Sequence, residues 1–144
     1  MAYCTLDDLK EHILEKDIAQ ITDDLQGKVV DEQKVSAMAQ KAADIIDGFL
    51  RGRYTLPLSS SPPLITSIAC DLTIYYLYER RFGLNMPETL QKRYENSMKL
   101  LKGIQSGMIL LGIESSEKGP GSGQYKVNKT AKDKIFNQDM LEKY

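Results

Sequence analysis

The segment from residue 22 to residue 33 has the oxygen-bearing side chains that come closest to a metal-binding pattern. With Gly27 at the sixth position of an EF-hand calcium loop, Thr22, Asp24 and Gln26 occupy positions one, three and five. The twelfth position holds Gln33, which lacks the bidentate carboxylate that calcium requires there. The segment is therefore interpreted as an acidic turn, and no metal site is expected.

Nucleophilic chemistry also lacks its partners in this sequence. The two cysteines, Cys4 and Cys70, do not form a CxxC pair, and His12 is the single histidine that could act as a base. Cys70 follows apolar Ala69 in an apolar helical pattern, where a thiol behaves as a small hydrophobic group. The glycine-rich run at 119–123 lacks the Gly-Lys-Ser/Thr of a phosphate loop. We expect neither an enzyme nor a bound cofactor.

Residues 75–82 interleave aromatic and basic side chains, with Tyr78, Arg80 and Arg81 among them. Bases stacked on the rings, with phosphates on the arginines, would make a nucleic-acid site that the lysine-rich tail could extend. On a helix, however, neighbouring tyrosines point in different directions, and half-buried tyrosines are typical of cores and protein interfaces. The core or interface interpretation is favoured, and nucleic-acid binding stays as the alternative.

The apolar spacing predicts an all-α fold, a compact bundle of four to five helices. Thr5 with Asp8 predicts the start of a first helix, and a second short helix is expected at about 15–21. Asp31 is predicted to cap a third helix that ends at Gly52. The remaining expected helices run from Pro63 to near Gly83 and from Pro87 to about 108.

Length and charge indicate one domain with an arm. The chain has 144 residues and a net charge of −1, made of −5 for residues 1–34, +3 for 35–113 and +1 for 114–144. A helical domain is expected at 1–113 and a flexible, Gly/Pro-containing C-terminal arm at 114–144. No stretch is long and apolar enough to suggest a membrane span. The opposite signs of the first two segments suit contacts between copies of the chain.

Several short motifs follow one another in the order and spacing of a known family. They are YCTLDDL at 3–9, ITDD at 21–24, VVD at 29–31, ADIIDGFL at 43–50, GRYTLPL at 52–58, PLI at 63–65, ACDL at 69–72 and RYE at 93–95. Over residues 3–113 the chain resembles the bacteriophage and prophage proteins typified by gp36 of phage Mu. The most specific piece is the loop formed by Gly52, Arg53, Tyr54, Leu56, Pro57 and Leu58.

The resemblance implies a small helical head–tail connector. Such a subunit would form a homo-oligomeric ring, dock portal, adaptor or tail-completion proteins, and let DNA pass through its channel without reading the sequence. It would reside in the cytoplasm of the bacterial host during assembly and then in the virion at the head–tail junction. The turn at 24–27 departs from the glycine- and aspartate-rich turn of many members, and the chain after Glu114 adds nothing to the resemblance.

A ring subunit needs two different, complementary faces. We hypothesise that the acidic N-terminal segment of one copy meets the basic helix surface of the next, and that the arm docks on a portal or tail protein. The residues predicted for this subunit interface are Asp7, Asp8, Glu11, Asp23, Asp24, Tyr78, Arg80, Arg81, Arg93 and Lys99.

Overall fold

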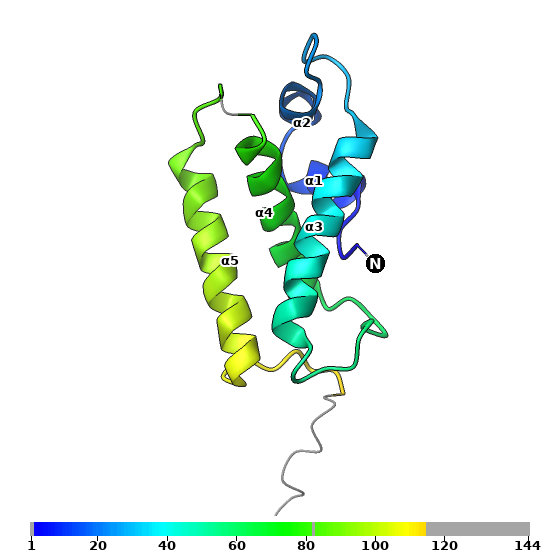
Figure 1. Cartoon of the computed structure of the whole chain (residues 1–144), viewed down its shortest axis with the longest axis vertical. Helices are drawn as coiled ribbons and strands as arrows, with labels where there is room; N and C mark the ends of the chain where they lie inside the picture. Colours follow the sequence, from blue (N-terminus) through cyan, green and yellow to red (C-terminus); the bar gives the residue numbers. More distant parts are fainter. Residues whose placement is uncertain (1, 82, 115–144) are drawn as a thin grey trace, which may run out of the picture.

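The computed structural model describes residues 2–81 and 83–114, and in these residues the chain is all-α, as predicted. Five helices follow one another along the chain and pack into a single bundle, elongated along the vertical axis of Figure 1. They are α1 (Leu6–His12), α2 (Glu15–Thr22), α3 (Glu32–Leu50), α4 (Pro63–Glu79) and α5 (Glu88–Ser106). None of the helices described is long and apolar enough to cross a membrane.

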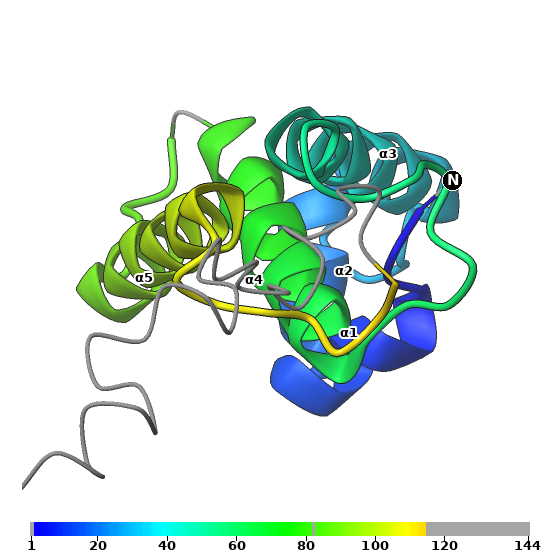
Figure 2. The same cartoon turned by 90° about the horizontal axis from the view of Figure 1, so that it is seen from below.

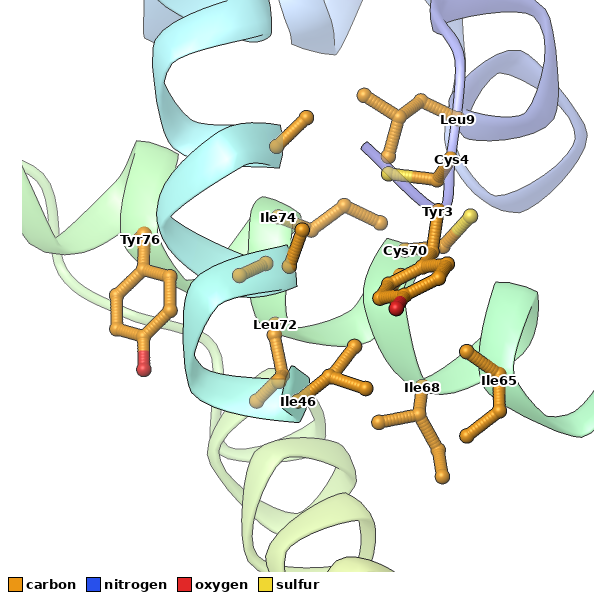
Figure 3. Packing of buried hydrophobic residues seen from close by; sticks show 14 of the residues in the cluster. Tyr3, Cys4, Leu9, Ile46, Ile65, Ile68, Cys70, Leu72, Ile74 and Tyr76 are labelled. Carbon is orange, nitrogen blue, oxygen red and sulfur yellow. The ribbon is translucent and has the colours of Figure 1, made fainter. Parts of the chain in front are cut away.

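Helix α4 is the centre of the bundle, because each of the other four helices packs against it. The sequence pattern predicted one wide apolar face, but α4 is buried nearly all round, including the positions of Cys70, Thr73 and Ile74. A helix surrounded in this way has no polar stripe to reveal its orientation. Figure 3 shows Tyr3, Cys4 and Leu9 of the N-terminal segment together with α4 side chains such as Cys70 and Ile74.

The helix starts are set by local hydrogen bonds that the sequence predicted. Thr5 accepts from the Asp8 backbone N–H while the Asp8 carboxylate accepts from the Thr5 N–H, which completes a capping box. Asp31 accepts from the Lys34 backbone N–H at the start of α3. Pro63 occupies the first turn of α4, where a missing N–H costs nothing.

The helix ends were predicted less well. Helix α3 ends at Leu50 and its C-cap is Arg51, so the prediction that Gly52 is the cap was wrong. Helix α4 ends at Glu79 and not near Gly83. The fifth helix, expected to reach about 108, ends at Ser106, and Gly107 is its C-cap in the left-handed conformation that suits glycine.

Replacing Gly48 with Ala should stabilise the monomer. Gly48 lies inside α3 on the solvent side, and a Cβ built there meets nothing within 4 Å. Because alanine loses less backbone entropy than glycine in a helix, the free energy of unfolding should rise by about 0.5–1 kcal/mol. Urea unfolding followed by circular dichroism measures this rise. An unchanged or lower free energy would mean that α3 is strained at this position.

Candidate functional site

The loop between α2 and α3, residues 23–31, stands at one end of the long axis of the bundle, and we call it the tip (Figure 1). The Asp23 carboxylate accepts backbone hydrogen bonds from Leu25, Gln26, Lys28 and Val29 at 2.9–3.4 Å. These bonds favour the charged form and lower the pKa of Asp23 to about 2. The tip is therefore an ordered loop organised around one carboxylate.

Three cations, one from α3 and two that directly follow α4, cap the C-terminus of α2. Arg80 donates to the carbonyls of Ile21 and Thr22, Arg81 donates to that of Gln20, and Lys34 Nζ lies 3.0 Å from the Thr22 carbonyl. The last turn of α2 has no basic residue of its own, so these side chains satisfy its unpaired carbonyls and its negative dipole end.

Asp24 forms ion pairs with two of the same cations, Arg80 and Lys34. Its carboxylate lies 2.8 Å from Arg80 Nη2 and 2.7 Å from Lys34 Nζ, and hydrogen bonds from Arg80 and then Lys34 hold the pKa of Asp24 well below its ordinary value. Asp23, Asp24, Arg80 and Arg81 thus all have partners inside one copy, and their predicted contact with another copy stays a prediction. Asp24, which stands at the third position of the calcium-like pattern, binds Arg80.

A second polar cluster links three helices. Asp71 of α4 lies 2.6 Å from Arg93 Nη2 of α5, an ion pair without hydrogen-bond geometry, and its other oxygen accepts from Ser97. Arg93 also contacts His12 Nδ1 of α1 at 2.9 Å. Because a guanidinium only donates, Nδ1 accepts in this contact. Arg93 is therefore a structural link, although it was predicted at the subunit interface.

The aromatic residues of α4 are engaged by their own chain. Tyr75 is stacked on Tyr94 with ring centroids 3.9 Å apart, Tyr76 is buried, and Tyr78 is half-buried. Burial raises the pKa of Tyr76 and Tyr78. With Arg80 and Arg81 bonded to α2, the segment offers no open stacking platform for bases in the described residues; Phe82 and the lysine-rich tail lie outside them.

The opposite end of the bundle is formed by residues 107–114, which we call the base. Seen from below, this segment runs from α5 across the end of α4 (Figure 2). Gly103 lets it fold back closely, because a Cβ there would lie 2.8 Å from Ile109 Cδ1. The Ile109 N–H then donates to the Gly103 carbonyl at 3.1 Å.

The family-like loop 52–58 holds the base in place. The buried Tyr54 hydroxyl accepts from the Leu111 N–H at 3.1 Å, and the Arg53 guanidinium lies against Gly107. Leu58 is buried in the core, Leu56 packs against it, and Gly52 and Pro57 are exposed. A peptide N–H bonded to a tyrosine 57 residues away could not be found from local sequence patterns.

Replacing Tyr54 with Phe should release the base without disrupting the core. The ring stays buried, but the Leu111 N–H loses its acceptor, so the free energy of unfolding should fall by about 1 kcal/mol. Hydrogen exchange should become faster at the Leu111 amide. Exchange in α4 should become faster only as far as the lower free energy of global unfolding requires. Unchanged exchange at Leu111 would contradict the assigned role of Tyr54.

Exposed charges that form no ion pair with another described residue occur on both α1 and α5. Asp7 and Glu11 belong to α1, and Lys99 and Lys102 belong to α5, which also has the exposed carboxylate of Glu95. In both views α4 lies between α1 and α5, and the end of α1 reaches α5 through the contact of His12 with Arg93 (Figures 1 and 2). Asp8, in contrast, is held in the capping box of α1. Of the predicted interface residues, Asp7, Glu11, Asp24 and Lys99 are exposed, and Asp7, Glu11 and Lys99 form no ion pair within the described residues.

The cysteines are both buried and unpaired. Cys4 Sγ lies 3.3 Å from Thr73 Oγ1, and the hydrogen bond with Cys4 together with burial raises the pKa of the Cys70 thiol. A protonated thiol inside the core packs as an apolar group, as predicted for Cys70.

Comparison with known proteins identifies the family. Residues 3–129 match the family described as Bacteriophage Mu, Gp36. The chain belongs to this phage protein family. The match confirms the resemblance and extends it beyond residue 113, to 129 of the C-terminal arm.

Two relatives of this chain show how much of it is similar to other phage and prophage proteins. The Mu-like prophage FluMu protein gp36 of Haemophilus influenzae is 29% identical over 92 residues, which cover 64% of this chain and 62% of that relative. Gene product J of Escherichia phage Mu is 27% identical over 142 residues, 96% of each chain. The second alignment therefore includes the tip, the base and most of the arm.

Proposed function

We propose that this chain is a structural subunit of a phage or prophage particle, in which copies form a closed ring around the DNA channel at the head–tail junction. The observation that carries the proposal is the family match over residues 3–129. On this proposal the chain acts by presenting surfaces, not as an enzyme. It would assemble in the host cytoplasm and remain in the virion.

The distribution of exposed charge supports contacts between copies. Two unpaired carboxylates, Asp7 and Glu11, belong to α1, and two unpaired ammonium groups, Lys99 and Lys102, belong to α5. A contact between unlike faces is heterologous, and it closes into a ring when the rotation between copies divides a full turn. Exposed ion pairs contribute only about 0–1 kcal/mol each, so these charges orient the copies more than they hold them together.

The ring's other partners would be a portal or adaptor ring on the head side and a tail-completion protein on the other. The arm, residues 114–144, is the proposed docking segment for one of them. DNA would pass through the channel without sequence-specific contacts. Binding of duplex DNA by the purified chain, with a steep dependence on salt, would instead support the nucleic-acid alternative.

A nonsense mutation in the gene, complemented in trans, tests the proposed function. Cells carrying the mutation should accumulate full or emptied heads and separate tails, and complementation by the wild-type gene should restore joined particles. Complementation by the Lys99→Glu variant should be impaired, and adding Asp7→Lys and Glu11→Lys to it should recover part of the yield. Normal joined particles without the protein would refute a connector role.

A further inference from the structure

The exposed large apolar side chains gather at the two ends of the molecule. At the tip, Leu25 and Val29 are 94% and 70% exposed, and Leu14, which precedes α2, is 71% exposed. At the base, Met108 and Leu110 are 85% and 73% exposed. Among the described residues, Leu84, at 41%, is the only other large apolar side chain that is exposed. Apolar surface of this kind marks interaction sites when it is grouped and rigidly held.

The backbone of the tip is fixed by hydrogen bonds, and a hollow lies beside it. The hollow has a volume of about 460 Å³ and lies between α2 and the tip. Its residues are Glu15, Lys16, Ala19, Gly27, Lys28, Val29 and Val30. Asp23 and Arg80 fix the adjoining backbone, so little conformational entropy remains to be lost when a partner enters.

The base is a protruding surface. Ile109 and Leu111 pack against the core, while Met108 and Leu110 between them point outward. The bond from Leu111 to Tyr54 holds this alternation in place. A flexible methionine beside a leucine suits insertion into an irregular apolar hollow.

The charges beside the two surfaces are also complementary. Lys16 and Lys28 are exposed at the hollow and form no ion pair within the described residues. Glu114 is exposed at the end of the base. A base seated at the tip of another copy would therefore bring a carboxylate toward two ammonium groups.

We infer that the tip of one copy binds the base of the next copy. The occupant of the tip is thus residues 107–114 of a second chain, with Met108 and Leu110 against Leu25, Val29 and the hollow. This inference deepens the proposed function and rests on it, since it names an end-to-end contact between the copies of the ring, as an alternative to a contact between the charged sides. Because tip and base differ, the contact is heterologous, as ring closure requires.

Complementary variants of the full chain test this contact by sedimentation velocity over a range of concentrations. A tip variant, Leu25→Glu with Val29→Glu, and a base variant, Met108→Glu with Leu110→Glu, should each associate at least about tenfold more weakly than the wild type. An equimolar mixture should form dimers that grow no further. Each dimer uses the intact tip of the base variant and the intact base of the tip variant, and its two free ends are both mutated. The control variant Leu84→Glu should associate like the wild type.

The same experiment has outcomes that overturn the inference. A base variant that still dimerises alone would show a tip-to-tip contact. Wild-type association in both variants would place the contact elsewhere, or on the charged sides alone. All four positions are exposed, so each variant should tolerate glutamate and keep its helices. Circular dichroism of each variant checks this.

Cross-linking covers the case of weak association. A chain with Val29→Cys mixed with a chain with Met108→Cys should form a mixed disulfide when oxidised glutathione is added, whereas the pair Gln40→Cys and Met108→Cys should not. Absence of the mixed disulfide, together with a monomeric wild type, would overturn the tip-to-base contact. The proposed function would then still stand or fall on the particle phenotype, which does not depend on this contact.

Discussion

Replacing Arg93 with Met should lower the free energy of unfolding by about 2–3 kcal/mol. The substitution leaves the Asp71 carboxylate, whose side chain is 14% exposed, without the cation 2.6 Å away. Removing one partner of a largely buried pair costs more than the pair itself contributes, because the remaining charge keeps its desolvation cost. The loss is smaller than for a fully buried pair, since the Arg93 side chain is 36% exposed.

The adjacent lysine is a matched control for Arg93. Lys92 pairs with Glu88 at 2.6 Å, but both side chains are mostly exposed, so Lys92→Met should change stability by less than about 0.5 kcal/mol. Adding Asp71→Leu to Arg93→Met should recover most of the loss, because no buried charge is then left alone. Urea unfolding of the four proteins measures these differences. Equal losses for Lys92→Met and Arg93→Met would contradict the structural role of the cluster.

The Arg80→Ala substitution should loosen the tip and cost about 2 kcal/mol of stability. Arg80 donates to two α2 carbonyls and pairs with Asp24, so its loss leaves backbone acceptors poorly satisfied as well as one carboxylate. Arg80→Lys should fall between, because one ammonium cannot reproduce the geometry of the guanidinium. Lys28→Ala, at an exposed tip residue, is the control and should have little effect. Amide exchange at residues 23–30 reports the loosening directly.

The pH dependence of the Arg80 effect has a definite sign. The pKa of Asp24 is lowered in the folded protein, so its contribution is complete above its ordinary value of 3.8 and disappears as the pH falls below it. The stability difference between wild type and Arg80→Ala should therefore be largest near neutral pH and shrink below about pH 4. Asp23, with a pKa of about 2, should add to the acid instability of both proteins equally. A difference that grows in acid would contradict the Asp24–Arg80 pair.

The parts of the fold that depend on neighbouring residues were predictable from the sequence. Thr5 and Asp31 start helices through bonds within one turn, Pro63 occupies the first turn of α4, and the positions of all three were predicted correctly. Helix ends were less predictable because tertiary contacts replace local caps. The C-terminus of α2 lies within one residue of its predicted position, but the source of its cap was not predictable, since the donors Arg80 and Arg81 lie about sixty residues further along the chain.

The predicted interface shows the same limit. The sequence could not show that Asp24 and Arg80 form an ion pair within one copy, whereas Asp7, Glu11 and Lys99 form none within the described residues. The apolar ends were missed for a related reason. Met108 appeared to continue the buried face of the fifth helix, whereas Gly107 ends that helix and the segment turns outward.

Electron cryo-microscopy of the assembled phage particle tests the central claim most directly. The account predicts a closed ring of copies at the head–tail junction, each fitting the five-helix bundle, around a channel wide enough for duplex DNA. It further predicts unlike faces in contact from copy to copy. A particle whose junction contains no density for this bundle, or that holds it as an isolated copy away from the channel, would contradict the account.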